Sequence, residues 1–326
     1  MLRTVAPRRI LLTGADGFAG AWALRQLESR RLPDLEIFAG VHKNEFSYRG
    51  ARAIGLDVAD RARVAEVVQA VKPSVVIHLA AVSTVHEARK DPRRAWEVNL
   101  GGTMNLAEAL LRHSPQARLI AVSTSEVYGG AASTRTGALD ETTALDPLNA
   151  YAASKAAADL LIGQMAREGL SAVRIRPFNH TGPGQTENFV IPAFATQIAR
   201  IEAGLQEPVM RVGNLEARRD FLDVRDVTDA YIDLAFSASP FEPGLVLNLA
   251  SGTSRRIGEI LNELLFLASV DVHVEIDPSR MRASETPFTN ADATRIRNLL
   301  GWRSRIPWSR TLADVLEFCR NKVARK

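Results

Sequence analysis

The sequence predicts an α/β protein in which a doubly wound parallel sheet carries a second, smaller α/β lobe. Short apolar runs alternate with stretches of helical periodicity over the first 178 residues, which is the pattern of repeated strand and helix units. A glycine-rich turn follows the first apolar run directly, and after Asn179 the alternation loosens into helices, short strands and loops. We therefore expect residues 1–178, with chain that crosses back near residues 213–250, to build the sheet domain, and residues 179–326 to build most of the smaller lobe.

The elements are expected in a regular order along the chain. Residues 75–81 form an almost unbroken apolar run, typical of a strand that is covered on both faces of a parallel sheet. A helix is predicted over residues 91–113 with an interruption at Gly101 and Gly102, and the polar segment 130–147 is expected to be a loop. The other predicted strands are residues 9–12, 36–41, a short strand ending at 55–58, 118–123 and 172–176, and the other predicted helices are residues 21–30, 61–71, 150–165, 254–268 and 308–323.

Composition narrows the classes of protein. The 326 residues are 46% hydrophobic and 24% charged, which suits a globular chain with one large core and a smaller lobe. The formal net charge is +4, but the basic residues are dispersed and no run mixes them with aromatics, so no nucleic-acid partner is expected. A single cysteine, Cys319, excludes an internal disulfide and a cysteine metal cluster, and we interpret it as a packed thiol in a reducing compartment. No apolar run approaches ~20 residues, so we expect a cytoplasmic protein with no membrane span and no metal site.

The turn after the first strand is the first candidate for ligand binding. Residues 13–20 read Thr-Gly-Ala-Asp-Gly-Phe-Ala-Gly, between a predicted strand and a predicted helix. Gly14 permits a tight turn, Gly17 lets the backbone approach a pyrophosphate, and Gly20 lets the helix pack closely on the strand. The helix N-terminus offers unbonded N–H groups to the anion. This placement indicates dinucleotide binding.

The ends of the next strands bear on which dinucleotide binds. An NAD-binding protein usually carries an acid at the end of the second strand, whereas this chain has His42 and Lys43. A cation suits a 2′-phosphate, which favours NADPH; NADH with a solvated Lys43 is the alternative. Asp57 could accept a hydrogen bond from the adenine amino group or cap the helix that begins near Asp60. His78 is interpreted as a hydrogen-bonded histidine at a strand end rather than as a base.

Tyr151 and Lys155 provide candidate proton-transfer chemistry. Their spacing places them one turn apart on the same face of a predicted helix. A lysine charge about 4 Å from the phenol, at an effective dielectric of about 20, is worth ~4 kcal/mol or about three pKa units, so we expect Lys155 to lower the pKa of Tyr151 toward neutrality. Taken alone, the pair also fits an Ala-rich helix whose Tyr packs and whose Lys faces water. Thr124 and Glu126 follow the strand at residues 118–123, at the sheet edge where doubly wound folds place their chemistry.

With these features together, the chain resembles the extended short-chain dehydrogenase/reductases that modify nucleotide sugars, over essentially its whole length. Three segments are similar to the GDP-6-deoxy-4-keto-D-mannose reductases, which form GDP-D-rhamnose: residues 176–185, 212–221 and 282–285. The resemblance implies a Rossmann-type sheet, NADPH as the cofactor, and reduction of the C4 keto group of GDP-4-keto-6-deoxy-D-mannose. It also implies a homodimer whose contact uses the Ala/Leu-rich stripes of residues 100–111 and 150–165; stripes that face the core of the same chain are the alternative.

The resemblance implies residue roles as well. Lys155 would bind the nicotinamide ribose, Thr124 would donate a hydrogen bond to the C4 keto oxygen, and Tyr151 would protonate it. Glu126 and Ser83 would orient sugar hydroxyls. The implied cofactor contacts are Gly14, Asp16, Gly17, Phe18, Gly20, His42, Lys43, Asp57, Val58, Leu79, Ala80, Ala81, Asn99, Tyr151 and Lys155. The implied nucleotide contacts are Asn179, Val190, Asn214, Arg219, Arg282 and Glu285, with the arginines on the diphosphate and Glu285 facing ribose or guanine; surface salt bridges for the arginines and a turn role for Asn214 are the alternatives.

The GDP-mannose 4,6-dehydratases share Thr124, Glu126, Tyr151 and Lys155, so the loop after Asn179 and His180 becomes the discriminating feature. In the dehydratases this loop carries paired arginines that retain the cofactor, whereas here residues 181–185 read Thr-Gly-Pro-Gly-Gln. A reductase must release its spent cofactor at every turnover, which favours a reductase.

Other functions stay open. Glu126 could abstract the C5 proton that elimination requires, although a Glu at that position also occurs in similar reductases. The remaining alternatives are therefore a dehydratase, a C3 or C4 epimerase, a reductase that forms GDP-6-deoxy-talose, and a non-catalytic dinucleotide-binding sensor.

Overall fold

Seven strands form the central sheet of the computed structural model, which describes residues 8–42, 46–134, 137–238, 240–281 and 290–325, with only the backbone at Ser133 and Thr134. The strand order is β10-β6-β5-β4-β1-β2-β3, and every neighbouring pair is parallel. From β1 the chain adds β2 and β3 on one side of the sheet, and then returns to add β4, β5, β6 and β10 on the other side. The switch in strand order therefore lies between β1 and β4, which is where an open α/β sheet binds its ligands. The strands are β1 (Arg8–Thr13), β2 (Leu35–Val41), β3 (Ala51–Gly55), β4 (Val75–His78), β5 (Arg118–Val122), β6 (Ala172–Pro177) and β10 (Val246–Leu249).

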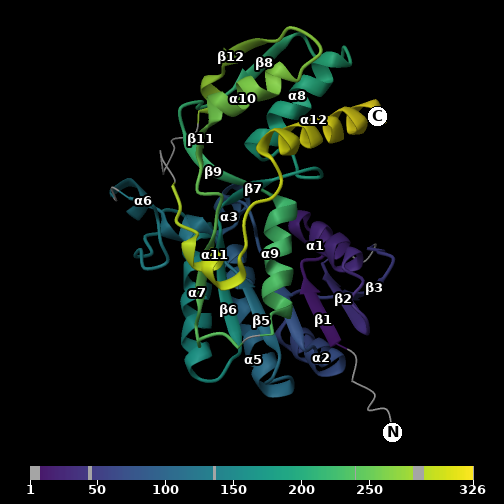
Figure 1. The fold of residues 1–326 in the computed structure, drawn as a ribbon, viewed down its shortest axis with the longest axis vertical. Coiled ribbons are helices and arrows are strands. Elements are labelled where there is room, and N and C mark those ends of the chain that lie inside the picture. The colour runs from purple at the N-terminus through teal and green to yellow at the C-terminus, as the bar shows by residue number, and fades with distance from the viewer. Residues whose placement is uncertain (1–7, 43–45, 135–136, 239, 282–289, 326) are drawn as a thin grey trace.

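Helices cover both faces of this sheet, which confirms the predicted doubly wound α/β class. On one face α1 and α9 pack side by side over an apolar core that includes residues of β1 and β2 (Figure 1). On the other face α2 packs against α5, and α5 against α7, over a second core. The helices that flank the sheet are α1 (Phe18–Ser29), α2 (Arg61–Val71), α5 (Thr103–His113), α7 (Ala150–Arg167), α9 (Val224–Phe236) and α11 (Thr294–Leu300).

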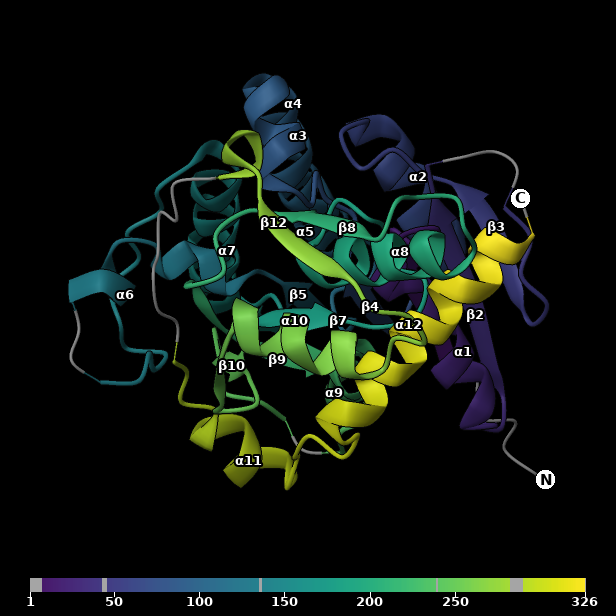
Figure 2. The same ribbon diagram turned by 90° about the horizontal axis from the view of Figure 1, so that it is seen from above.

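A smaller group of elements lies at the carboxyl ends of the central strands (Figures 1 and 2). The chain enters this group where β6 ends, since β7 begins at Asn179, two residues after β6. The group has a core of its own, in which Cys319 is buried with its Sγ 3.5 Å from the Thr196 hydroxyl, as expected of a packed thiol. Its helices are α8 (Val190–Glu202), α10 (Ile257–Phe266) and α12 (Trp308–Ala324), and its strands are β7 (Asn179–Thr181), β8 (Val209–Val212), β9 (Arg218–Asp223), β11 (Ser254–Arg256) and β12 (His273–Ile276).

Some boundaries differ from the predictions because tertiary contacts decide them. Helix α1 begins at Phe18, three residues early, with Gly17 as its N-cap. Residues 254–256 pair with β9 as β11, so the helix predicted from residue 254 begins only at Ile257. The predicted interruption near Gly101 is a π-helix that keeps the segment helical. The remaining elements are α3 (Val85–Lys90), α4 (Pro92–Trp96), η1 (Glu97–Gly102), η2 (Ser125–Tyr128), α6 (Ala131–Thr134) and η3 (Pro278–Arg280). Within the described ranges, no helix is long and apolar enough to cross a membrane.

Candidate active site between the two groups of elements

The glycine turn after β1 is closely packed. Gly14 has a φ of +69°, and a Cβ atom there would lie 2.7 Å from the backbone nitrogen of Ala80. A Cβ atom at Gly20 would collide with the Gly14 carbonyl oxygen. The N-cap of α1, Gly17, offers no side-chain acceptor to the first turn, so the N–H groups of that turn are open to an anion. The turn therefore has the shape and the polarity of a pyrophosphate cradle.

His78 ends β4 beside this turn and is hydrogen-bonded through both ring nitrogens. Its Nδ1 lies 2.7 Å from the Thr13 hydroxyl, and its Nε2 lies 3.1 Å from the Thr103 hydroxyl. Thr103 donates its proton to the Asn99 carbonyl at 2.6 Å, so His78 Nε2 must carry the ring proton. Burial, and then the charge of Lys155, lowers the pKa of His78 to about 3. The prediction of a neutral, hydrogen-bonded strand-end histidine is confirmed.

Asn99 forms hydrogen bonds both to the segment after β4 and to α7, the helix that carries Tyr151 and Lys155. Its amide nitrogen donates to the Val82 carbonyl at 3.2 Å and to the Ser154 hydroxyl at 3.0 Å, and its oxygen accepts from the Val82 N–H at 2.9 Å. Ser154 in turn donates to the Tyr151 carbonyl at 2.9 Å. The side chain predicted as a cofactor contact thus bonds to protein groups that position Tyr151.

The predicted catalytic hydroxyls do come together. The side chains of Tyr151, on α7, and Thr124, just after β5, lie close enough for the Thr124 hydroxyl to lower the pKa of Tyr151. Thr124 is also the N-cap of η2, where its oxygen accepts from the Glu126 N–H at 3.2 Å. Lys155, one turn along α7, donates from Nζ to the Val122 carbonyl at 2.5 Å.

The predicted effect of Lys155 on Tyr151 is wrong in this structure. Burial of the phenol by surrounding protein, although the residue keeps some exposed surface, raises the pKa of Tyr151 to about 12. The neighbouring Thr124 hydroxyl opposes this increase in the pKa, and the Glu126 carboxylate adds to it. Lys155 directs its ammonium to a backbone carbonyl, and its own pKa falls to about 8 because burial disfavours its charge. The Tyr151 phenol is therefore neutral and still carries its proton near pH 7.

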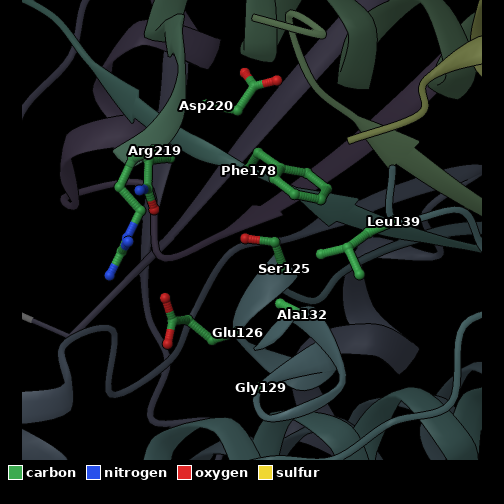
Figure 3. Close-up of a pocket in the computed structure, with 9 residues that line it drawn as sticks. Ser125, Glu126, Gly129, Ala132, Leu139, Phe178, Arg219 and Asp220 are labelled. Atoms are coloured by element: carbon green, nitrogen blue, oxygen red, sulfur yellow. The ribbon is translucent and has the colours of Figure 1, made fainter. Parts of the chain in front are cut away.

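Glu126 and Arg219 face each other across a small cavity, which we call the central pocket. Glu126 lies in η2 and Arg219 in β9, so the two groups of elements each contribute one charge. Burial lowers the pKa of Arg219, and attraction to the Glu126 carboxylate opposes that change. Figure 3 shows the two charged ends pointing toward one another. The pocket has a volume of about 10 Å³ and is lined by Ser125, Glu126, Gly129, Ala132, Leu139, Phe178, Asn179, Arg219 and Asp220.

A larger cavity, of about 330 Å³, lies beside α8, β8 and η3, and we call it the arginine cavity. Val190 begins α8 one turn before Ala193, which lines this cavity. Asn214 accepts from the Glu216 N–H at 2.9 Å, the geometry of a turn residue. The predicted contacts Arg282 and Glu285 lie outside the described residues. The lining residues are Glu187, Ala193, Gln197, Arg200, Gln206, Arg211 and Arg280.

Asp57 at the cofactor side of the sheet has partners that the sequence did not indicate. It accepts from the Ala59 N–H at 2.9 Å and from Arg94 at 2.8 Å, and these bonds outweigh burial and lower its pKa. Asp60 caps α2 instead, so the capping role offered for Asp57 is wrong. His42 is exposed and lies near Asp57. Lys43 lies outside the described residues.

The loop at residues 181–185 is attached to α1 of the same chain. Phe18 stacks on His180 with ring centroids 6.2 Å apart, and the Trp22 indole donates to the Pro183 carbonyl at 2.9 Å. The other predicted contacts are dispersed along the same sheet edge. Ser83 is exposed just before α3, and Val58 is buried against Gly102. The half-buried ones are Asp16 in the glycine turn and Leu79, Ala80 and Ala81 after β4. In the described part of the chain no group of three or more metal-ligating side chains is assembled.

Comparison with known proteins identifies the family. A sequence model described as GDP-mannose 4,6 dehydratase matches residues 11–315. This chain belongs to that family. It is 38% identical over 252 residues to the GDP-6-deoxy-D-mannose reductase of Pseudomonas aeruginosa, which covers 77% of this chain and 82% of that protein. It is 29% identical over 266 residues to GDP-mannose 4,6 dehydratase 1 of Arabidopsis thaliana, covering 80% of this chain and 72% of that protein.

A solved structure agrees with this assignment. The structure of RMD from Pseudomonas aeruginosa complexed with NADPH superposes with a TM-score of 0.83 at 32% identity, covering 97% of this chain and 99% of that chain. The family therefore includes relatives named as reductases and relatives named as dehydratases, and the Rossmann-like arrangement of the central sheet is shared with the solved relative.

Proposed function

We propose that this protein reduces the C4 keto group of GDP-4-keto-6-deoxy-D-mannose with NADPH and forms GDP-D-rhamnose. The observation that carries the proposal is the proximity of the Tyr151 phenol, which is protonated, to the Thr124 hydroxyl at the carboxyl end of β5. That pair lies in a chain 38% identical to a protein named GDP-6-deoxy-D-mannose reductase.

The cofactor fits the turn after β1. Gly14, Gly17 and the N-terminus of α1 would hold the pyrophosphate, and no acid stands at His42 to prefer a free 2′-hydroxyl. The similar solved protein is complexed with NADPH. When bound, this cofactor supplies the hydride, and NADH is the weaker candidate.

Side chains of this protein would supply and stabilise the proton transfer to the C4 oxygen. Tyr151 donates its hydroxyl proton to the C4 oxygen as negative charge develops there, and Thr124 donates a second hydrogen bond to the same oxygen. Lys155, held at 2.5 Å by the Val122 carbonyl, provides a positive charge one helical turn from the phenolate that remains. Glu126 and Ser83 would orient the sugar hydroxyls.

The nucleotide would bind outside the central pocket. The arginine cavity has room for a nucleoside and is lined by Arg200, Arg211 and Arg280, which suit a phosphorylated ligand. Arg219, at the central pocket, would contact the diphosphate that joins nucleoside and sugar. Asn179, Val190 and Asn214 stay proposed contacts of the same ligand.

The loop at residues 181–185 favours reduction over dehydration. It carries no arginine, and the bonds from Trp22 and Gln185 hold it on its own chain. Such a loop leaves the cofactor free to exchange at each turnover, as a reductase requires.

One experiment separates the two functions. Purified protein receives GDP-4-keto-6-deoxy-D-mannose with NADPH, and in parallel GDP-mannose without added cofactor, while absorbance of the reduced nicotinamide is followed. Stoichiometric NADPH loss with the keto sugar alone supports the proposal, and NMR of the product then distinguishes GDP-rhamnose from GDP-6-deoxy-talose. Keto-sugar formation from GDP-mannose, with no net NADPH loss, would establish a dehydratase in which Glu126 is the base.

We also propose that the protein is a homodimer through α5 and α7. These helices pack together. Met104 on α5, Leu160 on α7 and Trp96 on the neighbouring α4 expose 39%, 60% and 40% of their surface. Leu160→Glu should convert the dimer to a monomer by light scattering, whereas the same substitution at exposed Phe266, on the small group of elements, should not.

A further inference from the structure

We propose that the Glu126 carboxylate attracts the Arg219 guanidinium across the central pocket and yields it to the diphosphate of an incoming nucleotide, so that the carboxylate competes internally with the substrate. The inference rests on the proposed function, because the competing ligand is a nucleoside diphosphate. It assigns to Glu126 a positioning role that precedes any contact with the sugar.

The first step of the argument is the size of the central pocket. Glu126 and Arg219 extend into it from opposite sides and point toward one another (Figure 3). The volume left is about 10 Å³, room for about one water molecule. A sugar bound there must therefore displace side chains, and Glu126 and Arg219 are the flexible charged side chains that line the pocket.

The second step concerns which atoms can move. Next to Arg219, Asp220 is fully buried and accepts hydrogen bonds from Ser251 and Gly252 N–H groups at 2.9 and 2.7 Å. Next to Glu126, Thr124 caps η2 through the Glu126 N–H. The backbone is held by hydrogen bonds on both sides of the pocket. The pocket can therefore open only if the side chains of Arg219 and Glu126 move.

The third step is the relative strength of the two anions. An arginine fork matches a phosphate with two parallel charge-assisted bonds, and a diphosphate carries more charge than one carboxylate. Burial makes an uncompensated charge on Arg219 costly, and the charge of Glu126 offsets that penalty before the nucleotide arrives. Once the diphosphate takes the guanidinium, the carboxylate is no longer attracted toward Arg219 and can turn to the sugar hydroxyls. Nucleotide binding and sugar recognition are thereby coupled.

The test measures binding of GDP, which lacks the sugar, by calorimetry. Wild type, Glu126→Gln, Arg219→Gln and the double variant are compared, with Glu66→Gln as a control that removes one carboxylate from the exposed surface of α2. Arg219→Gln should weaken GDP binding. Glu126→Gln should tighten it about tenfold, and this gain should vanish in the Arg219→Gln background. Glu66→Gln should leave the affinity unchanged.

Several results would overturn the inference. An unchanged or weaker affinity in Glu126→Gln would mean that the carboxylate does not compete for Arg219. An equal gain with and without Arg219 would mean simple repulsion between Glu126 and the diphosphate. Failure of wild type to bind GDP at all would instead refute the proposed function. For GDP-mannose the gain in Glu126→Gln should be smaller than for GDP, because the amide also loses charge-assisted bonds to the sugar; a larger gain would contradict the release of Glu126 to the sugar.

Discussion

Replacement of Lys155 by Met should stabilise the protein while removing its activity. Burial lowers the pKa of Lys155 from 10.5 to about 8, and since each pKa unit is ~1.36 kcal/mol, keeping this ammonium charged in the fold costs about 3 kcal/mol at pH 7. Met fills a similar volume without the charge. It also loses the bond from the charged ammonium to the Val122 carbonyl, worth about 2 kcal/mol for a hydrogen bond to a charged group, which leaves a net gain of about 1 kcal/mol.

The sign of the pH dependence follows from the same shift. A lysine pKa that is lower in the folded state means that the unfolded chain binds the proton more tightly. The cost is fully present below the folded pKa of about 8 and disappears as the pH rises through the unfolded value of 10.5. The stability advantage of Lys155→Met should therefore be largest at pH 7 and should shrink as the pH rises from 8 toward 10.5.

Urea unfolding followed by circular dichroism at pH 7 and pH 10 measures both effects. Lys90→Met, at an exposed lysine of α3, is the matched control and should show neither the stabilisation nor its pH dependence. NADPH oxidation with the keto sugar should be lost in Lys155→Met and kept in Lys90→Met. A Lys155→Met protein that is less stable than wild type at pH 7, or an advantage that does not change with pH, would refute the desolvation argument.

Three further substitutions test other parts of the site. Tyr151→Phe removes the proton donor and keeps the ring, so turnover should fall about 10³-fold while NADPH binding by fluorescence titration stays at the wild-type value; near-normal turnover would contradict the proton-donor role. Asp159→Asn leaves half-buried Arg174 and buried Arg176 without the carboxylate that contacts both at 2.9 Å, and should lower the free energy of unfolding, measured in urea, by about 3 kcal/mol. A loss no greater than that caused by replacing an exposed Asp would show that the ion pair contributes little. Gly14→Ala places a Cβ atom 2.7 Å from the Ala80 nitrogen at a φ of +69°, so the Kd for NADPH by calorimetry should rise at least about tenfold; an unchanged Kd would remove this turn from the cofactor site.

Local sequence patterns were enough to predict most of the fold class. Apolar runs such as residues 75–78 form buried parallel strands because covering both faces requires an unbroken apolar run, and the chain places β4 there. The spacing of Tyr151 and Lys155 placed them on one helix, and the position of Thr124 after β5 brought its hydroxyl to the same edge of the sheet. Glycines 14, 17 and 20 lie where strand passes into helix, as their pattern indicated.

The tertiary structure decided what depends on neighbours remote in sequence. A phenol's pKa is set by the protein around it and by where nearby charges point, so burial and the bond from Lys155 to Val122 reversed the expected shift at Tyr151. Asp57 pairs with Arg94 and residues 254–256 pair with β9, contacts that no periodicity within either segment encodes. The charges of Glu126, in η2, and Arg219, in β9, face each other only because the folded chain brings these two elements to one pocket. Helical and strand patterns report local burial, whereas desolvation and charge pairing depend on distances between segments that only the folded chain brings together.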